Sequence, residues 1–83
     1  MDKFEGRWIW IEFLCKSVSG KTNEYIVRTK TDIFLGNIKW DTRWRKYAFY
    51  PMANTLYEEV CLEDIARFLK EQTAKHKVKG GEK

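Results

Sequence analysis

The sequence has few of the residues that build metal centres or disulfide frameworks. It contains one histidine, His76, and two cysteines, Cys15 and Cys61, which are far apart in the chain. Because a metal site needs clustered ligands, we expect no metal and no cofactor. Both cysteines fall in apolar segments and no secretory signal pattern begins the chain, so we expect free thiols. These absences favour a cytoplasmic protein.

Long apolar runs and catalytic groupings are also missing. Glu12 and Lys16 interrupt the longest apolar run, well short of the roughly 20 residues that a bilayer span requires. We therefore expect a soluble chain with no membrane partner. No nucleophile is paired with a base, and Glu63, Asp64 and Glu71 fit a solvated helix face. The sequence predicts that the protein is not an enzyme.

Aromatic residues and charges are abundant. Aromatics make up 16% of the 83 residues, including four tryptophans, which is enough apolar area for one small core without crosslinks. The charges are segregated, because residues 16–46 hold eight cations against three carboxylates, whereas residues 55–73 hold five carboxylates against two cations. A locally basic segment of this kind favours a polyanionic partner.

Hydrophobic periodicity predicts four strands followed by one helix. The strands are expected at residues 7–16, 24–30, 33–40 and 44–50, and the helix at residues 61–76. Residues 55–60 fit either a short edge strand or an extended lead-in to the helix. Short connections imply an α+β fold, a four-stranded antiparallel meander with the C-terminal helix packed on one face. Residues 1–76 would form a single domain and residues 77–83 a flexible basic tail.

Strand parity predicts which side chains face the helix, since side chains two residues apart share one face of a sheet. The strand residues assigned to the helix side are Ile9, Ile11, Phe13, Cys15, Tyr25, Val27, Ile38, Trp40, Tyr47 and Phe49. The helix would complete the core with Leu62, Ile65, Phe68 and Leu69. Gly36 is expected to mark a bulge or a close approach of two backbones.

The opposite face would mix cations with flat aromatic rings. Its candidate binding residues are Trp10, Arg28, Lys30, Lys39, Arg43, Trp44, Lys46 and Tyr50. Basic grooves lined with aromatic rings hold single-stranded nucleic acid, because bases stack on the rings and the cations follow the phosphates. The sequence therefore favours a non-catalytic module that binds single-stranded nucleic acid.

Three alternatives remain open for this face. Trp, Tyr and Arg also anchor protein interfaces, so the module could instead bind and inhibit a host protein. A deep aromatic and Arg-lined pocket would favour sequestration of a nucleotide. Trp8, Trp10 and Trp44 could also fill a second small core or a homodimer interface, since so small a domain can rarely spare tryptophans.

Two resemblances add expectations. Residues 19–69 contain Ile38-Lys39-Trp40, then Trp44-Arg45-x-Tyr47-x-Phe49-x-Pro51, then Cys61-Leu62. This pattern resembles a group of small uncharacterised proteins of phages and bacteria, which implies a phage accessory protein that acts in the host cytoplasm by blocking a host component such as a defence protein. The order of elements and the basic sheet are similar to PC4-like single-stranded DNA-binding domains, which implies a homodimer.

Overall fold

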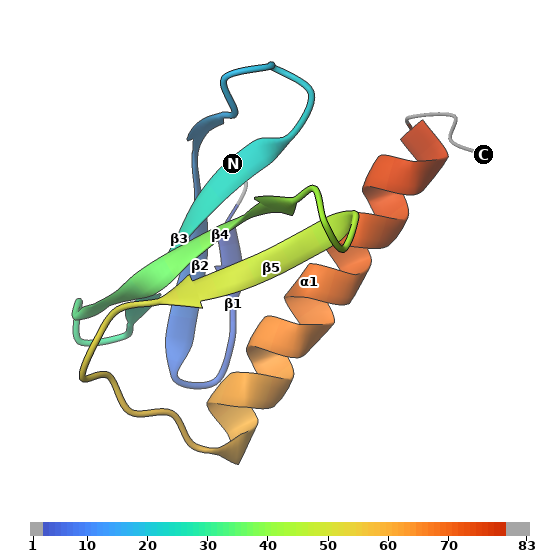
Figure 1. Cartoon of the computed structure of the whole chain (residues 1–83). Helices are drawn as coiled ribbons and strands as arrows, with labels where there is room; N and C mark the ends of the chain where they lie inside the picture. The colour runs from blue at the N-terminus through green and yellow to red at the C-terminus, as the bar shows by residue number, and fades with distance from the viewer. Residues whose placement is uncertain (1–2, 80–83) are drawn as a thin grey trace.

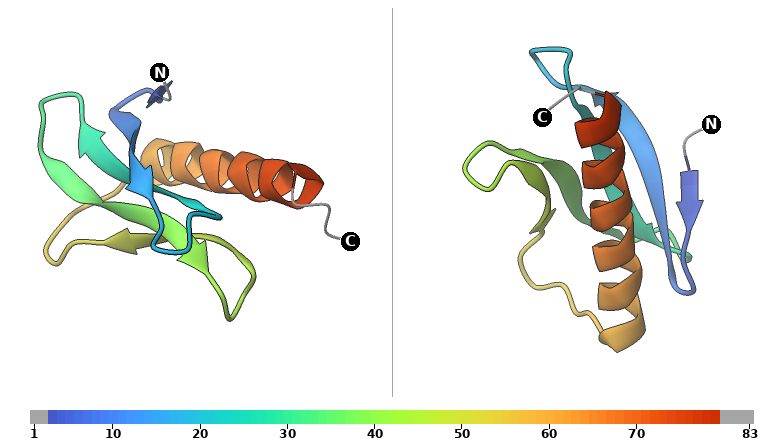
Figure 2. Two further views of the ribbon diagram at one scale, coloured as in Figure 1. Left: turned by 90° about the horizontal axis from the view of Figure 1, so that it is seen from above. Right: turned by 90° about the vertical axis from the view of Figure 1, so that its right-hand side faces the viewer.

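A five-stranded antiparallel sheet carries one long helix on one of its faces (Figures 1 and 2). The computed structural model describes residues 3–79, with side chains to residue 77. Its elements are β1 Lys3–Glu5, β2 Ile9–Lys16, β3 Asn23–Thr29, β4 Phe34–Asp41, β5 Lys46–Pro51 and α1 Glu59–Lys79. The strands lie in chain order, each antiparallel to the next. The α+β class, the antiparallel meander and the C-terminal helix are thus confirmed.

The core lies between the sheet and α1, as strand alternation requires. The most deeply buried strand side chains are Ile9, Ile11, Val27 and Ile38. From α1, the buried residues Cys61, Ile65 and Phe68 complete the cluster. Trp40, Phe49 and Leu69 pack against it and are partly buried.

The start of α1 is capped and tied to the sheet. The Glu58 carboxylate accepts the backbone N–H of Cys61 at 2.7 Å, which satisfies one of the free donors of the first helical turn. The Asp64 carboxylate accepts the N–H of Arg7 at 2.9 Å and so fixes the turn between β1 and β2 to the helix. The segment before Glu59 is therefore a lead-in, and residues 55–60 form no strand. Of the two possibilities for residues 55–60, the lead-in is correct for residues 55–58, whereas residues 59–60 already belong to α1.

The sequence predicted four strands, and the structure has five. β1 was missed because three residues are too few to show a period of two. The predicted first strand, 7–16, begins only at Ile9, since the N–H of Gly6 bonds to the Ile9 carbonyl at 2.9 Å and closes a turn. α1 runs to Lys79, so residues 77–79, expected in a flexible tail, are helical. The rest of that predicted tail, residues 80–83, lies outside the described residues.

Two bulges set the faces of β2 and β4. In β2 the register shifts between Phe13 and Cys15, which moves Cys15 to the face away from the helix, 3.9 Å from the Glu24 carboxylate. The assignment of Cys15 to the helix side was therefore wrong. In β4 the register shift leaves Leu35 as the extra residue beside Gly36, and both are buried. The bulge expected at Gly36 is confirmed.

Two residues predicted in the core are exposed. Phe13 is 40% exposed where the β2 bulge begins, just beyond Glu12, the last β2 residue that pairs with the described part of β1. Leu62 is 52% exposed because the buried stripe of α1 follows Cys61, Ile65 and Phe68, and Leu62 lies one position around the helix from that stripe. Periodicity alone does not distinguish the centre of an apolar stripe from its margin.

Candidate functional site

The eight candidate residues divide into two groups. One group, Trp10, Arg28 and Lys30, lies on or beside β2 and β3. The second group belongs to the hairpin formed by β4 and β5. It comprises Lys39, Arg43, Trp44, Lys46 and Tyr50. The two groups differ in how their positive charges are compensated.

The group on β2 and β3 is close to neutral because β1 and β2 supply carboxylates. Lys30 Nζ lies 2.9 Å from a Glu5 carboxylate oxygen, and Arg28 forms an ion pair with Glu12. Hydrogen bonds from Lys3 and then from Arg28 hold the pKa of Glu12 below its ordinary value, against the opposing effect of burial. These cations already have anionic partners, so they are poorly placed to take phosphates.

Trp10 is also occupied. Lys3 Nζ and Lys30 Nζ lie 4.3 and 4.7 Å from the centroid of its ring, in cation–π geometry. Trp10 is therefore a packing platform for two lysine side chains rather than an open ring. β1, which the sequence did not predict, brings both Lys3 and Glu5 to this region.

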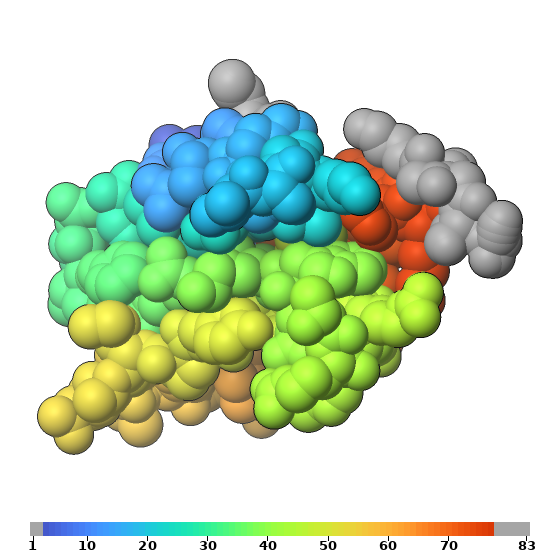
Figure 3. Space-filling model, turned by 45° about the horizontal axis from the view of Figure 1, so that its top comes forward, coloured from blue at the N-terminus to red at the C-terminus, as the bar shows by residue number. Residues whose placement is uncertain are grey.

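The β4–β5 hairpin, by contrast, presents a mostly exposed ring, with the Arg43 guanidinium carbon 5.9 Å from its centroid, among cations that are mostly uncompensated. Trp44 is 66% exposed in the turn, and Figure 3 shows the hairpin, in green to yellow-green, at the surface. Lys39 Nζ lies 5.0 Å from the centroid of the Tyr50 ring on the same face. Within residues 3–79, Lys39, Arg45 and Lys46 make no ion pair. We call Lys39, Arg43, Trp44, Arg45, Lys46 and Tyr50 the hairpin surface.

The prediction of a strand at 44–50 began two residues too early. β5 starts at Lys46, and Trp44 lies in the turn. Arg45 has a φ of 57° and its N–H bonds to the Asp41 carbonyl at 2.8 Å, which closes the turn with a left-handed residue. This geometry directs Trp44 out of the sheet rather than onto one of its faces.

Asp41 is the residue that organises the hairpin, and the sequence-based prediction did not include it. Its carboxylate is almost fully buried and accepts the N–H groups of Arg43 and Trp44 at 2.8 and 3.1 Å. It also accepts the Tyr50 hydroxyl at 3.2 Å and pairs with the Arg43 guanidinium at 3.0 Å. An aspartate that precedes a polar turn by one residue is a usual turn former, and this signal could have identified it.

These bonds make Asp41 a stronger acid than an ordinary aspartate. The Arg43 side chain first, then the N–H of Trp44, hold the pKa of Asp41 at about 2, below its ordinary 3.8. A carboxylate with a depressed folded-state pKa stabilises the fold above its unfolded pKa, and that stabilisation is lost as the pH falls through the folded value. The hairpin should therefore weaken between roughly pH 4 and pH 2.

Asp41→Asn is expected to flatten this acid-side loss of stability. The amide oxygen can still accept the N–H groups of Arg43 and Trp44, so the turn keeps its shape, but position 41 no longer titrates. Urea unfolding of both chains at several pH values between about 2 and 5 should show that the parent takes up about one more proton on unfolding. All other carboxylates titrate in both chains. If the free energy of unfolding changed with pH equally in the two chains, the lowered pKa assigned to Asp41 would be contradicted.

The described part of the chain offers neither a bilayer span nor a metal cluster. α1, the helix that residues 3–79 form, is not a long enough apolar segment to cross a bilayer. The same residues bring no three His, Cys, Asp or Glu side chains together in a way that could hold a metal ion.

Comparison with known proteins finds no matching family model, curated protein or solved structure. The resemblances to phage proteins and to PC4-like domains therefore stay predictions.

Proposed function

We propose that the protein is a non-catalytic binding module whose hairpin surface binds single-stranded nucleic acid. The observation that supports this most directly is Trp44, an exposed ring that projects from a turn held by a buried aspartate. Its neighbours along the chain and across the hairpin are cations. The bonds from the Arg43 and Trp44 N–H groups to Asp41 hold the turn backbone before any ligand arrives, which reduces the ordering entropy that opposes binding.

The chemistry of the surface matches a single strand better than a duplex. A base can stack on the Trp44 ring only if it is not already paired inside a helix, and such stacks contribute about 1–3 kcal/mol each. Lys39, Arg45 and Lys46 can then neutralise phosphates on either side of the stacked base. Every base has a face that can stack on the Trp44 ring, so we expect little sequence preference.

Trp44→Ala tests the proposal. Binding to a fluorescently labelled oligothymidine, measured by anisotropy, should weaken by roughly 5- to 150-fold, the equivalent of one lost stack. The melting temperature should hardly change because the side chain is mostly exposed. Trp8→Ala is the matched control, since Trp8 is also an exposed tryptophan but lies before β2, away from the hairpin. Equal effects of the two substitutions would contradict a specific role for Trp44.

A protein partner is the second candidate, and a separate apolar region favours it. Ile33, Phe34, Met52 and Leu56 are exposed large apolar residues. The N–H of Met52 bonds to the Leu35 carbonyl at 2.8 Å, so the segment after β5 lies beside the start of β4. Exposed apolar groups gathered in this way are typical of interaction sites. If the parent chain binds no oligonucleotide at low salt, binding and inhibition of a host protein becomes the better proposal.

Sequestration of a free nucleotide is less well supported. That function calls for a deep pocket lined by aromatic rings and arginines. The hairpin surface is open, and the pocket between β5 and α1 is lined by lysines, small or aliphatic side chains and one buried tyrosine.

A further inference from the structure

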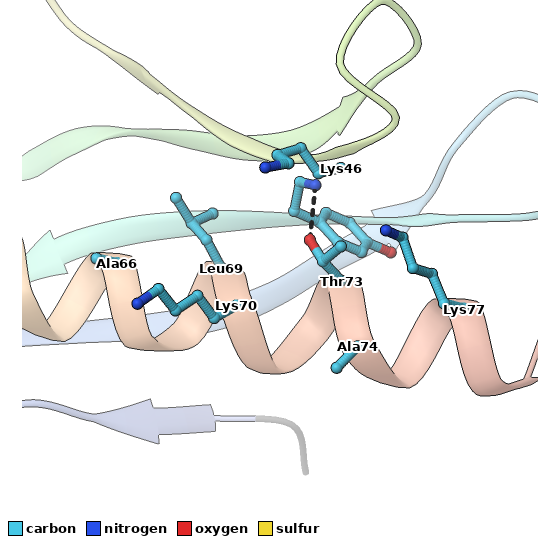
Figure 4. Close-up of a pocket in the computed structure, with 8 residues that line it drawn as sticks. Lys46, Ala66, Leu69, Lys70, Thr73, Ala74 and Lys77 are labelled. Atoms are coloured by element: carbon cyan, nitrogen blue, oxygen red, sulfur yellow. Dashed lines mark hydrogen bonds between the residues drawn. The ribbon is translucent and has the colours of Figure 1, made fainter.

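A groove runs between β5 and α1, on the far side of β5 from the other strands. It has a volume of about 470 Å³. Its lining residues are Lys46, Tyr47, Ala66, Leu69, Lys70, Thr73, Ala74 and Lys77. Figure 4 shows Lys46 on the strand wall and Lys70 and Lys77 on the helix wall. Because the helical lining residues extend from Ala66 to Lys77, the groove is about 16 Å long at 1.5 Å per residue.

The groove is a fixed feature of the fold. The N–H of Tyr47, on the free edge of β5, donates to Thr73 Oγ1 at 3.0 Å, as the dashed line in Figure 4 marks. This bond holds the strand edge to the helix. The Tyr47 ring is buried against Trp40 and His76, so it offers no face for stacking. Small side chains, Ala66 and Ala74, keep the helix wall low.

The charge of the groove has one sign. Three of its lining residues are lysines and none is a carboxylate. Among the residues the structure describes, Lys46, Lys70 and Lys77 take part in no ion pair. An apolar floor between unneutralised lysines is complementary to a chain that alternates apolar groups with anions.

The groove begins where the hairpin surface ends. Lys46 is the first residue of β5, so it follows the Trp44 turn directly and also forms one wall of the groove. A linear ligand that leaves Trp44 past Lys46 therefore meets Lys70 and Lys77 next.

We infer that this groove is a second subsite of the same surface, which receives the sugar–phosphate backbone of a single strand as it continues from Trp44 around the edge of β5. The inference rests on the proposed function. Lys46, Lys70 and Lys77 contact phosphates, and the sugars lie on the apolar floor. Since the groove has no open ring, it adds charge contacts rather than stacks. Its contribution is independent of base sequence and falls with salt.

Ala74→Glu is the sharpest test. It places a carboxylate between Lys70 and Lys77 on an exposed helical position, where glutamate is a good helix former and has lysines one turn away on either side. The melting temperature should not fall. Ala53→Glu is the matched control, because it changes the net charge equally but lies exposed in the segment between β5 and α1, outside the groove. Each chain is titrated with oligothymidines of about 3 and about 12 nucleotides.

The expected result depends on oligonucleotide length. For the longer oligothymidine, Ala74→Glu should weaken binding roughly 3- to 10-fold relative to Ala53→Glu and lower the salt slope by about 0.7 for each phosphate that the lysines no longer neutralise. For the shorter one, which reaches only the hairpin surface, the two variants should bind alike. If the variants also bind the longer oligothymidine equally while Trp44→Ala still weakens it, the groove inference is overturned and the proposed function stands. If the parent binds neither oligothymidine, the groove inference and the proposed function are both contradicted.

Discussion

Phe68→Ala is expected to lower the free energy of unfolding by about 3–5 kcal/mol, enough to unfold much of a domain of this size at room temperature. Phe68 is 6% exposed and is the aromatic contribution of α1 to the core. Its ring meets Tyr25 at 4.9 Å between centroids and Phe4 at 5.5 Å. Truncation therefore leaves a cavity under three elements, and the sheet cannot close around it without pulling away from the helix.

Leu62→Ala, on the same helix, is the control. Leu62 is one of the core residues predicted from the sequence, but it is mostly exposed, so its truncation should cost less than about 1 kcal/mol. Urea unfolding followed by far-ultraviolet circular dichroism measures both variants. Similar midpoints for Phe68→Ala and the parent would show that the core is not built around this ring.

Gly36→Ala is expected to be the second severe change, with a loss of roughly 3 kcal/mol or more. A Cβ atom at position 36 would lie 2.4 Å from the Tyr50 carbonyl oxygen and 2.9 Å from Pro51 Cα. Both atoms belong to the backbone of β5, which is paired with β4 at this point and cannot rotate away. The clash is relieved only if β5 separates from β4. That movement would also displace Tyr50 on the hairpin surface.

Gly20→Ala separates this clash from the loss of glycine as such. Gly20 has a φ of 78°, but a Cβ there would meet nothing within 4 Å. Only the cost of a left-handed alanine remains, about 1 kcal/mol. Thermal melts of the two variants should therefore differ clearly. If the Gly36→Ala chain were as stable as the Gly20→Ala chain, β5 would be able to move away from β4 at little cost. That result would contradict the predicted clash at position 36.

The candidate site was predictable in part. The sequence places Arg43, Trp44 and Lys46 together because they are neighbours in the chain, and strand pairing then adds Lys39 and Tyr50. Whether a cation is free depends on which carboxylate lies opposite it. Arg28 meets Glu12 across the β2–β3 pair, and Lys30 meets Glu5 from a strand 25 residues earlier. Such pairings are long-range, so charge counts along the chain do not reveal them.

By itself the sequence determined the elements that local physics controls. Periods of two and of 3.6, together with turn residues at the breaks, identify β2 to β5 and α1, and short connections then leave little choice but an antiparallel meander. Only the tertiary structure decided the features that depend on distant partners or on one-residue shifts in register. The bulge before Cys15 turns that residue to the other face, and β1 forms only because β2 offers it an edge. The buried Asp41 carboxylate likewise holds the turn that carries Trp44, because it accepts N–H groups of that turn.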